Sequence, residues 1–313
     1  MKKAIVTTTI NPPTEATIKF AQKCAQGWEF IIIGDTKTPH PAYRALEQQY
    51  PGVIYIDPDQ QEQQHKTLSD SIGWRSIQRR NIGFVEAYRR GADIVATVDD
   101  DNIPYEHWGK NLLVGTEVEI DLYEPAQEVF DPLSVTKANH LWHRGFPIQL
   151  LQGRLQNKHL GKTKRHVLVQ ADLWEGDPDI DALARLTFRP EVEYKDITHP
   201  YGGTTISPFN SQNTFLHRSV LPYYAVLPHV GRMDDIWGGY IMQRHFPQSV
   251  VYNTASVYQA RNPQDLIMNL EKEILGYRQT LNLLQNLESF ITYLPDETKV
   301  FWEAYRSSFS EHA

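Results

Sequence analysis

Hydrophobic and polar positions in the first hundred residues alternate between two periods, which predicts strands and helices in turn. Apolar, β-branched runs typical of buried strands occupy residues 3–10, 28–35, 53–57 and 94–98. Apolar residues at helical spacing predict helices over residues 14–26, 41–49 and 71–90. Residues 58–68 are rich in Gln, Asp and His, and we expect a mobile loop there. Strands alternating with helices favour parallel βαβ units and an α/β fold.

The chain loses this rhythm after about residue 115. We expect residues 115–260 to fold onto the first half, 1–114, rather than to form a separate domain. Apolar residues in 265–292 recur at i, i+3 and i+4, which predicts a long amphipathic helix, and a last helix is expected over about 296–308. These C-terminal helices, within 261–313, are expected to pack on the domain formed by 1–260.

The composition is that of an ordinary globular protein, with 41% hydrophobic and 22% charged residues among 313. The formal net charge of −7 argues against general nucleic-acid binding, which uses a basic face. Cys24 is the single cysteine, which excludes an internal disulfide and fits a reducing, cytoplasmic compartment. No stretch approaches the roughly 18 apolar residues that span a bilayer, so contact with a membrane-bound substrate would be peripheral.

Three consecutive carboxylates, Asp99, Asp100 and Asp101, follow the strand over 94–98. Adjacent like charges repel one another, so the cluster predicts an offsetting cation. Oxygen ligands on a short turn suit Mg²⁺ or Mn²⁺, which commonly bridge carboxylates to phosphates. Strand pleating turns Asp99 and Asp101 one way and Asp100 the other, so Asp99 and Asp101 are the predicted metal pair. An acidic turn that caps the following segment is the alternative.

Polar residues gather at the predicted carboxyl ends of the strands, where open parallel sheets bind their ligands. Asp35 follows the second strand, where an acidic side chain can reach a ribose hydroxyl or a nucleobase. Arginines on the helix predicted over 71–90 suit diphosphate oxygens, although a solvated basic face is the alternative. The predicted nucleotide-sugar residues are Thr8, Thr9, Asn11, Asp35, Arg75, Arg80, Asn81, Asp100, Asn213 and Trp237.

Two further motifs combine charged and aromatic residues. Asp234 and Asp235 start a predicted helix, where they cap the helix or act as a general base or stabiliser of a glycosyl cation. Trp237 and the two glycines after it would leave room for a sugar to stack on the indole. Arg144 lies within the aromatic segment 142–147, where it caps a turn or meets an anionic partner.

Spaced blocks over residues 3 to about 245 carry a resemblance to known proteins, namely IVTTTINPPTEA, TVDDDN, LWHRGFP, PFNSQNT and RMDDIWGGY. They resemble the glycosyltransferase-like STELLO proteins and the reversibly glycosylated polypeptides, the plant UDP-arabinopyranose mutases. The order of acidic triplet, Arg-Gly-aromatic-Pro and Asp-Asp-hydrophobic-Trp is the most specific part. The first block is similar to STELLO rather than to the mutases, and we expect this protein to differ from STELLO in lacking the membrane anchor and long extensions.

The resemblance implies a GT-A-type, Rossmann-like mixed sheet flanked by helices, with a C-terminal helical extension. It implies a nucleotide-diphosphate sugar, most often UDP-linked, and Mn²⁺ or Mg²⁺ at Asp99 and Asp101. It also implies that residues 1–114 form the nucleotide-binding half of a catalytic domain and that residues 115–260 form its acceptor half. Arg144 matches the arginine that is glycosylated in the mutases, and Asp234 and Asp235 match the second acidic pair.

We therefore expect a metal-dependent glycosyltransferase, with Asp234, Asp235 and Arg144 as catalytic residues and a carbohydrate or glycolipid as acceptor. One alternative is a pyranose–furanose mutase with a transient glycosyl-arginine at Arg144. A non-catalytic binding or assembly protein is the other. The sequence leaves the sugar, the acceptor and homo-oligomer formation open.

Overall fold

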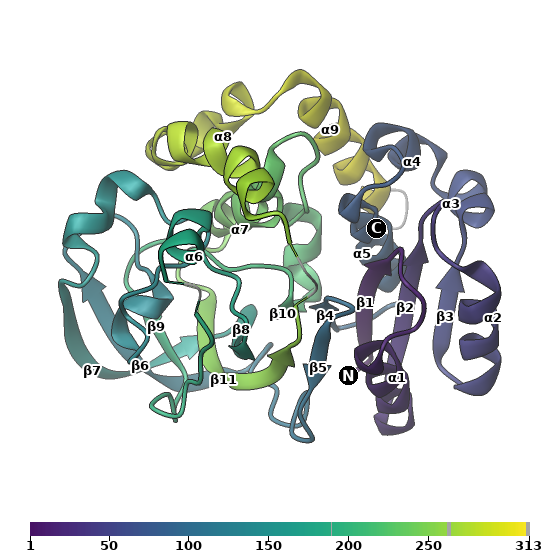
Figure 1. Ribbon diagram of the computed structural model, residues 1–313, viewed down its shortest axis with the longest axis horizontal. Coiled ribbons are helices and arrows are strands. Elements are labelled where there is room, and N and C mark those ends of the chain that lie inside the picture. Colours follow the sequence, from purple (N-terminus) through teal and green to yellow (C-terminus); the bar gives the residue numbers. More distant parts are fainter. Residues whose placement is uncertain (189, 262–263, 311–313) are drawn as a thin grey trace.

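The computed structural model describes residues 1–188, 190–261 and 264–310, and within these ranges eleven strands form one mixed sheet. The strand order is β3-β2-β1-β4-β10-β8-β11-β9-β6-β7, with β5 paired to β11 at the side of this path (Figure 1). The predicted α/β fold, a mixed sheet flanked by helices, is confirmed.

The first half contains the parallel strands and the helices that connect them. The elements are β1 (Lys3–Thr9), α1 (Glu15–Gln22), η1 (Lys23–Gln26), β2 (Trp28–Gly34), α2 (His40–Gln49), β3 (Val53–Ile56), α3 (Pro58–Gln64), α4 (Lys66–Ile72), η2 (Ile77–Arg79), α5 (Arg80–Arg89) and β4 (Ile94–Val98). Strand β2 pairs with β1 and β3, and β1 pairs with β4, all in parallel.

Local chemistry explains where two sequence predictions were wrong. The mobile loop expected over 58–68 is instead helical, because Asp57 and Gln60 form a reciprocal capping box at the start of α3. The single helix expected over 71–90 is broken, because Gly73 takes a left-handed φ of 76° and ends α4. Helix α5 begins only at Arg80, so the arginines of this segment do not share one helix face.

The second half adds antiparallel strands and most of the irregular segments. The elements are β5 (Asn102–Pro104), β6 (Glu117–Pro125), η3 (Pro132–Val135), η4 (Ile148–Gly153), β7 (Asn157–His166), β8 (Val169–Gly176), α6 (Ala182–Phe188), β9 (Tyr201–Gly203), β10 (Asn213–His217), η5 (Arg218–Tyr223), η6 (Gly231–Met233), α7 (Asp234–His245), β11 (Val250–Gln259), α8 (Leu266–Gln285), η7 (Leu287–Tyr293) and α9 (Asp296–Ser310). Strand β10 joins the two halves by pairing antiparallel with β4 and β8.

Alternate residues of the central strands enter two hydrophobic cores, one on each face of the sheet. In β1, Val6 packs in the core beneath α4, α5, α7 and α9, whereas Ile5 packs in the core beneath α1 and α2. Both side chains are fully buried. Burial on both faces explains why the first strands read as continuous apolar runs.

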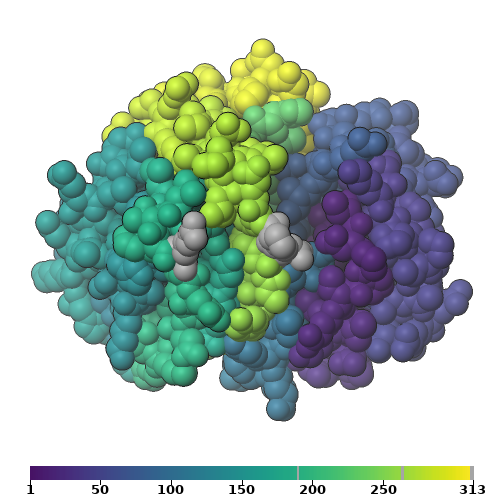
Figure 2. Space-filling view, in the orientation of Figure 1, coloured from purple at the N-terminus to yellow at the C-terminus, as the bar shows by residue number. Residues whose placement is uncertain are grey.

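The two C-terminal helices border both halves of the molecule, with α8 near α6 and α9 near α4 and α5 (Figure 1). Trp237 on α7 donates to Thr280 on α8, and Figure 2 shows the C-terminal segment, in yellow, next to both halves. The hydroxyl of Tyr305 on α9 donates to the carbonyl oxygens of Leu221 and Tyr224, at 2.9 and 2.8 Å. The predicted helix over 265–292 ends earlier, at Gln285, and a 3₁₀ segment follows. No helix in the described ranges is both long and apolar enough to cross a membrane.

Candidate active site

Two cavities meet beyond the carboxyl ends of β1, β2 and β4, and they share the wall formed by residues 75–77. The larger cavity has a volume of about 490 Å³ and the smaller one about 330 Å³. Besides 75–77, the smaller is lined by Thr8, Thr9, Ile10, Asn11, Asp35, Lys37 and Asp100. Charged residues of both signs line the larger, namely Asp99, Asp101, Arg144, Asp179, Arg232, Asp234, Asp235, Arg261 and Lys272.

Asp35 holds the backbone of the shared wall in place. Its two carboxylate oxygens accept hydrogen bonds from the backbone nitrogens of Arg75 and Ser76, both at 3.0 Å. Arg75 has a φ of 60°, which a non-glycine residue adopts only where its surroundings fix it. Asp35 therefore fixes the partition, and the expected contact of its carboxylate with a ribose stays a prediction.

The acidic turn sends its carboxylates into different cavities. Asp99 and Asp101 line the larger one, and Asp100 lines the smaller one. Asp100 accepts hydrogen bonds from the hydroxyl of Thr9 and from the amide of Asn11. Asp99 forms an ion pair with Arg80, which is itself fully buried and lies outside both cavity linings. Arg80 thus positions Asp99, and its expected contact with a nucleotide is corrected.

Asp101 is the carboxylate of this turn with an unpaired oxygen, although the positive charge of Arg261 lowers its pKa in part. Its Oδ1 atom is buried and receives no hydrogen bond from any residue in the described ranges. Burial and the nearby charges of Asp99 and Asp100 raise the pKa of Asp101 to about 7. A bound divalent cation would stabilise such a carboxylate in its ionised form, so the residue fits a metal. No group of three or more His, Cys, Asp or Glu side chains is gathered for a metal within the described ranges, so carboxylates alone give an incomplete ligand set.

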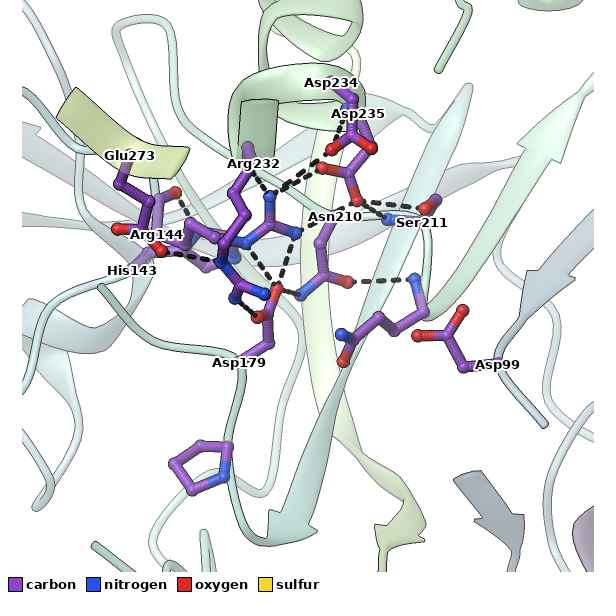
Figure 3. Close-up of polar contacts among 12 residues, drawn as sticks. Asp99, His143, Arg144, Asp179, Asn210, Ser211, Arg232, Asp234, Asp235 and Glu273 are labelled. Atoms are coloured by element: carbon purple, nitrogen blue, oxygen red, sulfur yellow. Dashed lines mark hydrogen bonds and ion pairs between the residues drawn. The ribbon is translucent and has the colours of Figure 1, made fainter. Parts of the chain in front are cut away.

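Arg144 is the centre of a buried ionic network on the opposite wall (Figure 3). Its Nε and Nη2 atoms donate to Oδ2 of Asp179 at 2.9 and 2.7 Å, and its Nη1 lies 3.0 Å from Oδ1 of Asp235. Burial disfavours its charge, but the three carboxylates around it raise the pKa of Arg144 well above its ordinary value. The guanidinium therefore stays protonated.

The two carboxylates at the start of α7 differ in their partners. Asp235 accepts hydrogen bonds from the backbone nitrogen and hydroxyl of Ser211, at 2.8 and 2.9 Å. Burial raises the pKa of Asp235, but Arg144 and Ser211 outweigh burial and hold that pKa below its ordinary value. Asp234 lies 3.7 Å from Arg144, and burial together with the charge of Asp235 raises the pKa of Asp234 to about 7.

Asp179 belongs to this site, although no motif in the sequence indicates it. It forms ion pairs with Arg144, Arg232 and Arg261, at 2.7, 3.2 and 3.7 Å. Burial opposes ionisation, but these arginines lower the pKa of Asp179 far below its ordinary range. Because its partners lie at distant points in the chain, no local motif could have revealed the role of Asp179.

Three predicted ligand-binding residues lie in the core instead. Trp237 is fully buried and its indole donates to Thr280 at 2.9 Å, so the expected stacking on a sugar is corrected. The glycines after it allow close packing, since a Cβ at Gly238 would lie 1.8 Å from the carbonyl oxygen of Ala225. Asn81 and Asn213 are also buried and line neither cavity. The Asn81 amide donates to the backbone carbonyls of Gln78 and Val226, and the Asn213 amide donates to that of Leu173, so these amides hold the backbone instead of facing a ligand.

No model of a known protein family matches the chain. Two curated proteins of Arabidopsis thaliana are similar to it. One, named probable glycosyltransferase STELLO2, is 24% identical over 317 residues, covering 88% of this chain and 40% of that protein. The other, named probable glycosyltransferase STELLO1, is 24% identical over 267 residues, covering 78% of this chain and 33% of that protein. The chain thus spans less than half the length of either relative.

A comparison with solved structures finds a mannosyltransferase from Pyrobaculum calidifontis in complex with GDP-mannose and Mn²⁺. The two chains are 10% identical and their superposition has a TM-score of 0.44. The match covers 98% of this chain and 69% of the mannosyltransferase chain. The similarity to the STELLO proteins agrees with the motifs noted in the sequence. The resemblance to the mutases stays a prediction.

Proposed function

We propose that this chain is a metal-dependent glycosyltransferase of the GT-A type that uses a nucleotide-diphosphate sugar, with UDP-sugars as the first candidates. The observation that carries the proposal is the pair of cavities divided by residues 75–77, with the acidic turn facing both. The similarity to proteins named as probable glycosyltransferases supports group transfer as the activity.

The donor would lie across the partition. The smaller cavity, with Thr8, Thr9 and Asn11, takes the nucleoside, and the larger cavity takes the sugar. The diphosphate lies between them, within reach of Arg75, which lines both cavities. Arg261 and Lys272 add positive charge to the larger cavity, which suits a leaving diphosphate.

Asp99 and Asp101 are the residues that would hold Mn²⁺ or Mg²⁺, and Arg80 keeps Asp99 in place. A divalent ion bound there supplies positive charge that stabilises the developing charge of the diphosphate. The buried, unpartnered oxygen of Asp101 supports this assignment.

Asp234 is our candidate for the proton acceptor. A base works best when its pKa lies near the working pH, and the pKa of Asp234 is raised to about 7. Gln78 donates to its Oδ2 atom at 2.9 Å and so orients the carboxyl group. Asp235 remains ionised and fixed by Arg144 and Ser211, which suits stabilisation of positive charge at the anomeric carbon.

Mutase chemistry at Arg144 is the second candidate, because Arg144 lines the same cavity as Asp234. A covalent bond to the sugar would require a guanidinium nitrogen to lose a proton. Its buried carboxylate partners oppose that loss, since they raise the pKa of Arg144 well above its ordinary value. These contacts support a positioning role for Arg144.

A thermal-shift screen of nucleotide-diphosphate sugars, with and without Mn²⁺, tests the donor site because ligands that bind the native state raise its melting temperature. We expect at least one UDP-sugar to raise it only with Mn²⁺, and Asp101→Asn to abolish that shift. Asp70→Asn, at an exposed position on α4, is the control and should keep the shift. Equal shifts in wild type and Asp101→Asn would contradict the metal assignment.

Incubation with the labelled sugar found by this screen then separates the candidate functions. Transfer of label to an added acceptor supports the transferase. Label retained on the protein and lost in Arg144→Lys supports the mutase. Binding without transfer, hydrolysis or labelling supports a non-catalytic binding protein.

A further inference from the structure

Besides Oδ1 of Asp235, which pairs with Arg144, three buried side-chain oxygen atoms of the larger cavity's lining receive no hydrogen bond from the residues that the structure describes. They are Oδ1 of Asp101, Oε1 of Gln212 and Oε1 of Gln259, and all three residues line the cavity. Gln212 and Gln259 are 7% and 2% exposed, so both amide side chains are more than nine-tenths buried. A buried acceptor without a donor is costly, and such groups require an explanation.

The backbone brings these three residues together from distant parts of the chain. Gln259, at the end of β11, stands opposite Asn102 in the ladder with β5, and the next residue donates its nitrogen to the carbonyl oxygen of Asp101 at 3.1 Å. The amide of Asn102 donates to the backbone carbonyl of Gln212 at 2.8 Å. Gln212 and Gln259 thus lie on either side of the end of the acidic turn.

A divalent cation would satisfy these three oxygens together. Mg²⁺ and Mn²⁺ favour about six oxygen ligands, and amide carbonyls serve as neutral ligands beside carboxylates. Carboxylates alone are too few here, because Asp99 also pairs with Arg80 and no trio of acidic, His or Cys side chains is gathered in the described ranges. A bound water has only two protons and would leave one of the three acceptors unpaired. The buried Nε and Nη2 atoms of Arg261 line the same cavity, but neither donates a hydrogen bond to any of the three.

We infer that Gln212 and Gln259 complete the metal site, with their amide oxygens binding the divalent cation beside Asp101. The inference rests on the proposed metal-dependent function and adds two ligands to it. Neither residue belongs to the acidic triplet, and each reaches the cavity from a different strand region, Gln212 before β10 and Gln259 at the end of β11.

Titration of the full chain with Mn²⁺ alone, followed by the free-ion electron paramagnetic resonance signal, tests the inference without any nucleotide. We expect Gln212→Met and Gln259→Met, which keep the side-chain length but remove the oxygen, each to weaken Mn²⁺ binding by at least about tenfold. Gln259→Glu, which replaces the amide by a carboxylate, should bind Mn²⁺ more tightly than Gln259→Met.

Gln264→Met is the matched control, since Gln264 lines the same cavity but its oxygen already accepts a hydrogen bond from Asn269 at 2.7 Å. It should bind Mn²⁺ like wild type. Wild-type melting temperatures for the variants establish that they are folded, and Gln259→Glu keeps the test valid if a Met variant is not.

The outcomes separate this inference from the proposed function. If wild type binds Mn²⁺ and loses it in Asp101→Asn, but both Met variants bind like wild type, the two amide ligands are refuted and the metal-dependent function stands. If the Met variants bind Mn²⁺ normally but bind the nucleotide sugar weakly, the amide oxygens accept hydrogen bonds from sugar hydroxyls instead. The inference is then wrong. If wild type binds no Mn²⁺, the metal part of the proposed function fails together with it.

Discussion

Asp234 and Asp235 are neighbours in the first turn of α7, yet their pKa values shift in opposite directions. The difference follows from distance to Arg144, which is 3.0 Å for Asp235 and 3.7 Å for Asp234. Asp235 takes the negative charge of the pair, and its charge together with burial keeps a proton on Asp234 up to a pH of about 7. The pair is therefore divided into a fixed anion and a group that exchanges a proton near neutral pH.

Replacement of Asp234 by Asn should lower the transfer rate by about 10²- to 10⁴-fold while leaving donor binding intact, because the side chain keeps its shape but loses the carboxylate that we propose as the base. In wild type the rate should rise with pH through about 7, since Asp234 accepts a proton only when ionised. The check is kcat measured from acidic to alkaline pH in both proteins. A full rate in Asp234→Asn would exclude this residue as the base.

The same pKa has a consequence for stability. Because burial raises the pKa of Asp234 above its unfolded value, the folded state holds an extra proton between about pH 4 and 7. The stability contribution of this group is therefore lost as pH rises through that window. At pH 8 we expect Asp234→Asn to melt at least about 2 °C above wild type, with a smaller difference at pH 5. An equal difference at both pH values in calorimetry would contradict the raised pKa.

Removal of Arg144 should destabilise the protein strongly. Arg144→Met leaves the buried carboxylates of Asp179 and Asp235 without their main partner, and breaking a buried ion pair in this way costs about 3–5 kcal/mol. The free energy of unfolding from urea denaturation measures this loss. Arg278→Met, at an exposed position on α8, should change it by less than about 0.5 kcal/mol.

Arg75 offers a test of the partition between the cavities. Arg75→Gly removes the guanidinium but suits the left-handed backbone, so the fold should be as stable as wild type. Loss of a charge-assisted contact should weaken UDP binding by about tenfold or more and uridine binding less. Lys37 lines only the smaller cavity, so Lys37→Ala should affect UDP and uridine alike in calorimetric titrations. Equal losses for both ligands in Arg75→Gly would place the diphosphate elsewhere.

Glu273 should connect the stability of α8 to the active site. This fully buried residue accepts from Arg232 at 2.8 Å and from the backbone nitrogen of Ala182 at 3.0 Å. Glu273→Gln removes its charge and should lower the free energy of unfolding by about 1–3 kcal/mol. Glu271→Gln is the control, because Glu271 lies two residues earlier on the same helix and is exposed. Equal stability of the two variants would show that Arg232 is held by other contacts.

The sequence predicted those parts of the fold and site that depend on local patterns. Strand periodicity located β1 to β4. The expected separation of Asp100 from Asp99 and Asp101 agrees with the cavities that they line, although the three lie in a turn after β4 rather than in a strand. These features depend on residues adjacent in the chain, so a single sequence contains them.

Features that depend on tertiary contacts could not be read in this way. Trp237 and Asn213 look like ligand-binding residues in the sequence, but packing places both in the core. Asp179 was missed because its arginines come from three other segments. The break at Gly73 was missed because the apolar pattern continues on both sides of it.

Residues 75–77 form the boundary between the two cavities, and the carboxylate of Asp35 holds this boundary through two hydrogen bonds. A small molecule that occupies only the smaller cavity therefore contacts the same backbone segment that borders the larger cavity. Such a molecule needs neither a sugar nor a phosphate to act on both cavities, because displacing residues 75–77 would change the shape of both at once.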